Sequence, residues 1–173
     1  MKSLFASTVL ALTLAGSAYA DSSVKLSDVH LCCQSCVKGV QKAVAKVPGV
    51  KAESDMDAKT VSLTAPDAAT LQKGVDSLVA AGYYGKSSDA AVKVNGETGA
   101  KDAKVKTLKI EDTHLCCASC VKAVNRALKD IPGVTSNDAA KGNTSFTVTG
   151  DDFSEKAVFD ALQKEGMTGH VAK

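Results

Sequence analysis

Residues 30–50 read HLCCQSCVKGVQKAVAKVPGV, and residues 114–134 read HLCCASCVKAVNRALKDIPGV. Both stretches open on His-Leu-Cys-Cys-Xaa-Ser-Cys and close on Pro-Gly-Val, and they begin 84 positions apart. The two opening blocks, residues 30–36 and 114–120, contain all six cysteines and two of the three histidines. Because the chain shows no other reactive constellation, soft ligands gathered at two matching places favour metal binding over catalysis.

The residues after each block predict an amphipathic helix. Apolar side chains recur at steps of three and four, which is the spacing of one buried helical stripe. We expect helices over about 35–46 and 119–129, each ended by its Pro-Gly pair. The stripe residues are Val37, Val40, Val44 and Val47 in the first copy, and Val121, Val124, Leu128 and Ile131 in the second.

The rest of each copy repeats one order of elements. A strand precedes each block, two strands follow the first helix, a second helix begins near Asp67 or Asp152, and a short strand follows Gly82 or Gly166. Glu155 is the expected capping partner of the last helix. The alternating pair Val61 and Leu63 corresponds to Phe146 and Val148 in the second copy, which lie 85 positions further on instead of 84. We therefore expect the turn before this strand to be longer in the second copy. The fold class is therefore α+β, with two ferredoxin-like βαββαβ sandwich domains.

The predicted boundaries are residues 21–87 and 104–173 for the two domains, with a flexible linker over 88–103 that is rich in Ser, Asp, Lys, Gly and Ala. A short extra strand through Val92 and Val94 is the alternative for the linker. Residues 1–20 have the features of a cleavable signal peptide, which predicts a periplasmic or secreted protein without a membrane anchor in its mature form. The formal net charge of +2 gives no electrostatic case for nucleic acid as a partner.

Each block lies at the junction between a predicted strand and the predicted helix that follows it. Free backbone N–H groups at a helix start favour thiolates. Sulfur-rich sites select Cu(I), Zn(II) or toxic mimics of these ions. We expect up to one ion per domain. His30 and His114 would complete a tetrahedral Cys3His set suited to zinc, or else orient the loops by hydrogen bonding. The candidate ligands are Cys32, Cys33 and Cys36 in the first domain and Cys116, Cys117 and Cys120 in the second.

The chain resembles tandem heavy-metal-associated domain proteins, and is similar to periplasmic mercury-binding proteins, copper chaperones and the soluble modules of metal-exporting ATPases. That family carries Gly-Met-Xaa-Cys-Xaa-Xaa-Cys, whose cysteine pair matches Cys33 and Cys36, and again Cys117 and Cys120. This chain has His-Leu in place of Gly-Met and one added cysteine in each block. The resemblance also implies a place near the metal for Tyr83.

The function expected from these features is non-enzymatic sequestration or delivery of a metal ion, with Cu(I) slightly favoured over Zn(II). The resemblance implies a metal-transporting membrane protein or another metal-binding module as partner. A periplasmic thiol–disulfide redox protein is the alternative, since paired cysteines also suit thiol exchange. Basic residues on each first helix, such as Lys42 and Arg126, either form a solvated face or guide docking to an acidic partner.

Overall fold

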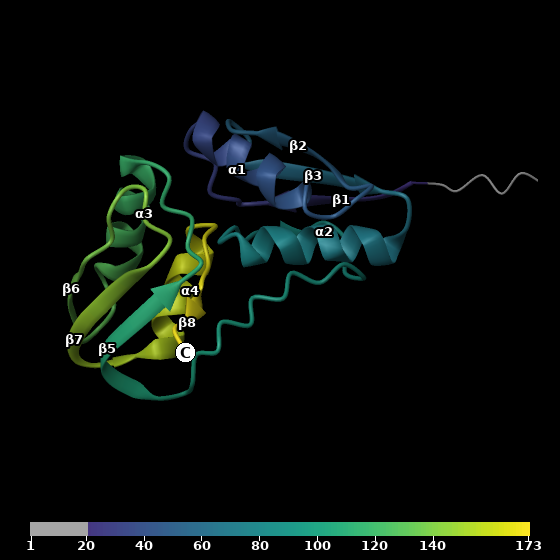
Figure 1. Ribbon diagram of the computed structural model, residues 1–173. Helices are drawn as coiled ribbons and strands as arrows, with labels where there is room; N and C mark the ends of the chain where they lie inside the picture. Colours follow the sequence, from purple (N-terminus) through teal and green to yellow (C-terminus); the bar gives the residue numbers. More distant parts are fainter. Residues whose placement is uncertain (1–20) are drawn as a thin grey trace, which may run out of the picture.

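The computed structural model describes residues 21–173, and the expected signal peptide lies outside the described residues. Two four-stranded sheets, each with two helices, form what we call the N-terminal unit (residues 22–87) and the C-terminal unit (residues 104–171) (Figure 1). The N-terminal unit contains β1 (Ser22–Ser27), α1 (Gln34–Val44), β2 (Lys51–Asp55), β3 (Thr60–Ala65), α2 (Ala68–Ala80) and β4 (Lys86–Ser87). The C-terminal unit contains β5 (Lys104–Glu111), α3 (Ala118–Leu128), β6 (Val134–Asn137), β7 (Phe146–Ser154), α4 (Glu155–Lys164) and β8 (His170–Val171).

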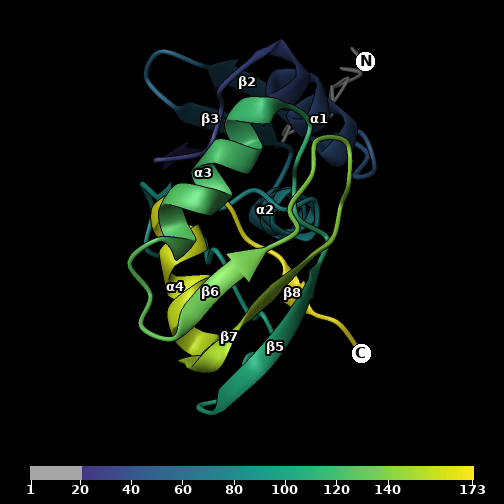
Figure 2. The same cartoon turned by 90° about the vertical axis from the view of Figure 1, so that its left-hand side faces the viewer.

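The strand order is the same in both sheets. It is β2-β3-β1-β4 in the first and β6-β7-β5-β8 in the second, and every pairing is antiparallel. Figure 2 shows α3 and α4 together on one side of the second sheet. The predicted βαββαβ order and α+β class are therefore confirmed. Among the described residues, none of the helices has the length and apolar character needed to cross a membrane.

The one-residue shift in the second copy preserves the buried face of its sheet. Val24 pairs with Leu63 in the first sheet, and Leu108 pairs with Val148 in the second. All four side chains are buried. A longer loop between β6 and β7 absorbs the extra residue, so Val148 faces the helices as Leu63 does.

The start of α4 differs from the prediction. Asp152 is not its N-cap, because β7 continues to Ser154 and pairs there with Lys104 at the start of β5. Ser154 caps the helix by accepting from the Ala157 N–H at 3.2 Å. Glu155 does not act as a capping partner, since its carboxylate accepts from the Lys101 N–H at 2.8 Å. The capping of α2 by Asp67 is confirmed by its bond from the Thr70 N–H at 2.8 Å.

Residues 88–103 form no helix or strand, so the alternative strand through Val92 and Val94 is not formed. The segment runs beside α2 and on toward β5 (Figure 1). The Gln72 side-chain amide bonds both backbone groups of Lys93, at 2.7 and 2.9 Å, and the Val171 N–H donates to the Thr98 carbonyl at 2.8 Å. The segment is therefore held along both units, which differs from the flexible linker expected from its composition.

The loops that follow α2 and α4 join the two units. The Tyr84 N–H donates to the Gly166 carbonyl, and the Thr168 N–H donates to the Gly82 carbonyl, both at 3.1 Å. Between these bonds Tyr83 and Met167 form an antiparallel bridge. Residues 82–84 of one unit contact residues 166–168 of the other, and the two segments occupy equivalent positions in the repeat. The contact therefore has an approximate twofold axis. The two units meet through a shared backbone ladder.

Gly82 and Gly166 are the residues that permit this contact. Both have left-handed backbone angles, with φ of 84° and 76°. A Cβ at Gly166 would lie 2.2 Å from the Asp28 carbonyl oxygen, and one at Gly82 would lie 2.5 Å from the His114 nitrogen. Only glycine satisfies both the helix ending and the close approach of the opposite unit.

We predict that Gly166→Ala destabilises the protein more than Gly142→Ala. Both positions have positive φ, of 76° and 89°, so both substitutions carry a backbone cost of about 1 kcal/mol. Only Gly166 is crowded by the other unit, whereas a Cβ at Gly142 would meet nothing within 4 Å. Urea unfolding followed by circular dichroism measures the costs, and hydrogen exchange at the Tyr84 amide reports the contact. Equal costs with unchanged exchange would contradict this account.

Candidate metal centre

The six cysteine sulfurs form one cluster at the junction of the two units. Across the junction, Sγ–Sγ distances are 3.3 Å for Cys32–Cys117, 3.5 Å for Cys36–Cys116, 3.6 Å for Cys32–Cys120 and 3.7 Å for Cys33–Cys116. The sequence predicted a site in each unit, and the structure brings both ligand sets to one place. All six are free thiols, at separations far above the roughly 2.05 Å of a disulfide bond.

The cluster contains close sulfur pairs within each unit as well. Cys33–Cys36 is 3.8 Å and Cys117–Cys120 is 3.7 Å, so each Cys-Xaa-Xaa-Cys pair converges as the spacing predicted. Cys32 lies 3.6 Å from Cys36, and Cys116 lies 3.7 Å from Cys120. The approximate twofold axis of the backbone contact therefore also relates the sulfurs.

Local backbone structure fixes the depth of each sulfur. Cys33 and Cys117 are the N-cap residues of α1 and α3, and neither uses its side chain as a cap. Cys36 and Cys120 fall in the first helical turn and are fully buried, whereas Cys32 is exposed. Leu31 and Leu115 are buried in the core ahead of the cysteines. The predicted strand-to-helix placement of the thiols is confirmed, with buried and accessible sulfurs in one cluster.

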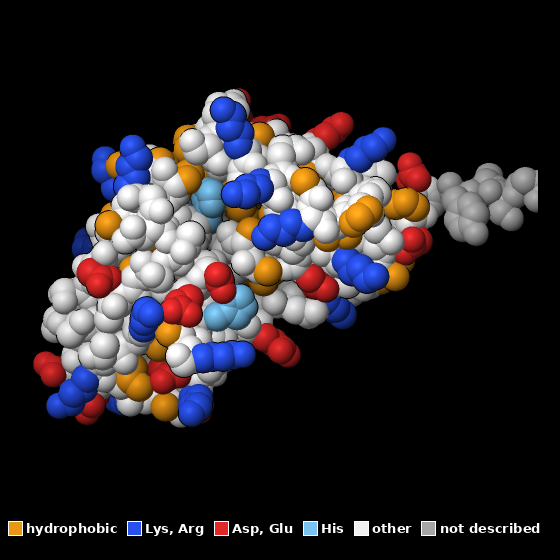
Figure 3. Space-filling model, in the orientation of Figure 1, with side chains coloured by type: hydrophobic (Ala, Val, Ile, Leu, Met, Phe, Trp, Pro, Cys, Tyr) orange, Lys and Arg blue, Asp and Glu red, His pale blue; other side chains and the backbone are white. Residues whose placement is uncertain are grey.

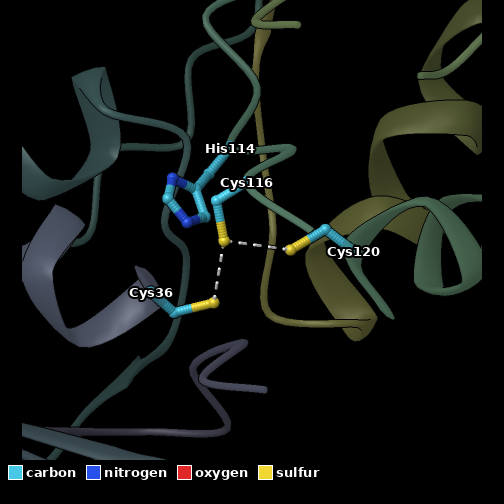
Figure 4. A group of neighbouring side chains, drawn as sticks. All are labelled: Cys36, His114, Cys116 and Cys120. Carbon is cyan, nitrogen blue, oxygen red and sulfur yellow. Dashed lines mark hydrogen bonds between the residues drawn. The ribbon is translucent and has the colours of Figure 1, made fainter. Parts of the chain in front are cut away.

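His114 lies inside the centre beside the opposite unit. Its ring is 4.5 Å from the Tyr83 ring, centroid to centroid, and the Tyr83 hydroxyl lies 3.1 Å from Nε2. The same hydroxyl donates to the Cys36 carbonyl at 2.7 Å. Figure 4 shows the Cys116 sulfur between those of Cys36 and Cys120, with the His114 imidazole beside it. Tyr83 does lie next to the cluster, between the two cysteine blocks.

His30 occupies the corresponding place at the other end of the cluster. A ring nitrogen of His30 lies within 4.8 Å of the Cys32 and Cys120 sulfurs, and His114 is equally close to Cys36, Cys116 and Cys120. The His30 Nε2 atom is buried and has no hydrogen-bond partner among the described residues. Burial lowers the pKa of His30, which favours the neutral imidazole that ligates metals. Both histidines are therefore placed where they could complete a ligand set.

Hydrogen bonding within the cluster gives the thiols very different acidities. The proximity of the Cys120 thiol lowers the pKa of Cys36 well below its usual range, although burial opposes this. The proximity of Cys36, together with burial, raises the pKa of Cys120. Burial is also the main cause of the raised pKa of Cys32 and of Cys116. A few thiolates are thus stabilised by neighbouring thiols, since six anions cannot crowd together without a cation.

Cys117 shows the effect of the helix start. Burial works to raise its pKa, but this is outweighed by the nearby backbone N–H groups of Cys120 and Ser119 at the start of α3 and by the contact with the Cys32 thiol. Together these neighbours lower the pKa of Cys117 to about 6. An accessible thiolate is available there near neutral pH, as free helix-start amides predict.

Two clefts lead to the cluster from opposite sides. One, of about 370 Å³, is lined by His114 and Cys116 together with Lys42 of α1 and Lys46 just after that helix. The other, of about 350 Å³, is lined by His30 and Cys32 together with basic residues such as Lys122 and Arg126 of α3. Figure 3 shows basic side chains around a histidine where the units meet. Each cleft thus pairs a histidine and the first cysteine of one block with a basic helix of the other unit.

A carboxylate also borders the second cleft. Glu165 accepts from Arg126 through both its oxygens, one bond being 2.9 Å from Nε to Oε1. The hydrogen bond from Arg126 is the main cause of the lowered pKa of Glu165. Sequence reasoning missed this pair, since nothing in the spacing of the two residues along the chain brings them together.

The fold and the site together define a βαββαβ protein with a thiolate-rich candidate metal centre. No known family profile matches the sequence. The chain is 32% identical, over 82% of its length, to Copper-transporting ATPase 1 of Rhizobium meliloti, and 32% identical over 76% of its length to Copper-transporting ATPase 2 of the same organism. It spans only 16% and 14% of the lengths of these two relatives.

Solved structures with some likeness include the N-terminal soluble domains of Bacillus subtilis CopA. The match covers 89% of this chain and 95% of that one, at 16% identity and a TM-score of 0.35. The N-terminal domain of PacS from Synechocystis matches 40% of this chain and all of its own length, at 22% identity and a TM-score of 0.34.

We predict that Tyr83→Phe destabilises the reduced protein by about 1–2 kcal/mol, because it removes the donor to the buried Cys36 carbonyl. Tyr84→Phe is the matched control at a half-buried position, with an expected effect within about 0.5 kcal/mol. Urea unfolding under reducing conditions compares the two variants. A Tyr83→Phe variant as stable as the parent would show that the hydroxyl does not support the Cys36 loop.

We predict a pH-dependent effect for Glu165→Gln. The folded-state pKa of Glu165 is below its ordinary value of 4.5, so its contribution is present above that value and is lost as pH falls through the folded pKa. The variant should be less stable by about 0.5–1 kcal/mol at pH 7, and the difference should shrink as pH falls below 4.5. Urea unfolding at pH 7 and at a series of acidic pH values tests this. A difference that stays constant with pH would refute the proposed ion pair.

Proposed function

We propose that this protein binds a soft metal ion through its six cysteines, with Cu(I) favoured over Zn(II), and sequesters or delivers that ion. The observation that carries the proposal is the convergence of six free thiols at separations of 3.3–3.8 Å. Thiolates arranged around one metal ion lie at such distances, since metal–thiolate bonds are about 2.3 Å long. Soft sulfur ligands select Cu(I) ahead of harder ions.

The charge properties of the centre support cation binding. Crowded thiols share protons, and a bound cation replaces those protons while it neutralises the thiolates. The exposed Cys32 and the two clefts give an incoming ligand access, so the ion can leave by thiolate exchange. The similarity to copper-transporting ATPases supports copper as the ion and a metal-transporting membrane protein as the partner.

Zinc is the second candidate ion. Ring nitrogen and sulfur atoms of one set, Cys36, His114, Cys116 and Cys120, all lie within 4.8 Å of one another. Three sulfurs and one imidazole nitrogen make the tetrahedral environment that zinc prefers. Export to a periplasm, inferred from residues 1–20, is part of the proposal, and the role proposed there is non-enzymatic.

We predict that anaerobically reduced protein binds Cu(I) tightly enough to compete with a strong Cu(I) chelator, and that a variant with all six cysteines changed to serine does not. X-ray absorption should show sulfur neighbours, and nitrogen in addition if zinc is the cargo. Titration with Zn(II) under a zinc chelator gives the preference between the ions. Weak binding of both ions together with disulfide-reducing activity would replace this function with thiol–disulfide exchange.

A further inference from the structure

We propose that the two cysteine blocks form one composite centre, in which the first cysteine of each Cys-Cys doublet is a ligand in the site of the other unit. The inference rests on the proposed function and specifies its ligand sets. The two triads are Cys33–Cys36–Cys116 and Cys117–Cys120–Cys32. Each combines the Cys-Xaa-Xaa-Cys pair of one unit with the added cysteine of the other.

The sulfur distances define these two triads. In the first, the Sγ–Sγ sides are 3.8, 3.7 and 3.5 Å. In the second, the sides are 3.7, 3.6 and 3.3 Å. The centre of such a triangle lies about 2.1 Å from each sulfur, slightly inside a metal–thiolate bond length of about 2.3 Å. A small outward relaxation therefore fits one ion into each triad.

The backbone explains why the added cysteine serves the opposite unit. Cys33 has an extended backbone, with φ −165° and ψ 169°, and neighbouring side chains of an extended segment point to opposite sides. Cys32 therefore diverges from Cys33 and comes within 3.3 Å of Cys117. Cys117 is also extended, with φ −150° and ψ 171°, so Cys116 diverges from it in the same way.

The triads are joined through shared contacts. Cys32 lies 3.6 Å from Cys36, and Cys116 lies 3.7 Å from Cys120, so each added cysteine also contacts a sulfur of the other triad. A thiolate has several lone pairs and can bridge two Cu(I) ions. The six sulfurs thus form one centre for at least two Cu(I) ions that lie close together, in place of two independent sites.

Hydrogen bonds between protein backbone groups hold this centre together. The bonds from Tyr84 to Gly166 and from Thr168 to Gly82 fix the units relative to each other. The His30 backbone N–H also donates to the Gly166 carbonyl, at 3.1 Å, two residues before the first cysteine doublet. Preorganisation of this kind lowers the entropy cost of gathering ligands from distant parts of the chain.

Cu(I) binding replaces protons on the cysteine sulfurs with the metal ion. One Cu(I) and three cysteine sulfurs give a Cu(I)–tris-thiolate of charge −2; each sulfur that was protonated releases its proton, and no oxidation state changes. Lys42 and Lys46 on one side, and Lys122 and Arg126 on the other, line the clefts beside the triads and offset this charge.

The ligand sets are tested in the full chain carrying Cys117→Ser and Cys120→Ser, which leaves only the first triad and Cys32. This variant should bind one Cu(I) with three sulfur neighbours by X-ray absorption. Adding Cys116→Ser should reduce the count to two sulfurs and weaken Cu(I) binding at least tenfold in chelator competition. Adding Cys32→Ser instead should keep the count at three sulfurs and weaken Cu(I) binding less than Cys116→Ser does. The opposite pattern, with Cys32 required and Cys116 dispensable, would overturn the composite centre while preserving the proposed function.

A measurement on the unmodified chain tests the same proposal if these variants misfold. With two equivalents of Cu(I), X-ray absorption should show copper–copper scattering, and sedimentation should show a monomer. Two bound Cu(I) ions without a copper–copper signal would refute the composite centre. A chain that binds no Cu(I) at all would instead refute the proposed function.

Discussion

The candidate centre depends on one backbone contact. The loops after α2 and α4 exchange hydrogen bonds through Gly82 and Gly166, and the positive φ of each glycine turns the chain back at the end of its helix. Because the contact follows the approximate twofold axis, it places the beginnings of both cysteine blocks next to it, as the bond from His30 to Gly166 shows. Without this contact the same sequence would present two separate groups of three thiols.

The cysteine sulfurs differ in solvent exposure, and their proposed roles differ accordingly. Cys36 and Cys120 are sealed in the core at the first turns of α1 and α3, so their positions are set by packing. Cys32 is open to solvent at the end of a cleft. A buried thiolate holds an ion firmly but cannot meet an incoming ligand. The combination of fixed inner sulfurs with an accessible outer one therefore suits the proposed sequestration or delivery, which requires both firm binding and exchange.

The sequence predicted what periodicity and spacing control. Apolar steps of three and four predicted α1 and α3, and the repeat predicted the order of helices and strands along both units. It missed the start of α4, because Asp152 resembles an N-cap while the pairing of Ser154 with Lys104 extends β7 past it. It also missed the convergence of the blocks. Motif spacing fixes which sulfurs meet within a unit, but the meeting of two units depends on loop contacts that have no sequence signature of their own.

The centre is symmetric in its sulfurs and asymmetric around them. Gly39 of α1 leaves room for Tyr83 and His114, since a Cβ there would lie 2.1 Å from the Tyr83 hydroxyl oxygen. The corresponding position of α3 is Ala123, and Met167 stands where Tyr83 would repeat. His114 is therefore engaged by a hydroxyl, whereas the buried Nε2 of His30 has no partner among residues 21–173. A free imidazole nitrogen can join the sulfurs around an ion, and an engaged one must first give up a hydrogen bond. The two ends of the centre thus differ in the donors they offer, although the cysteine blocks are nearly identical.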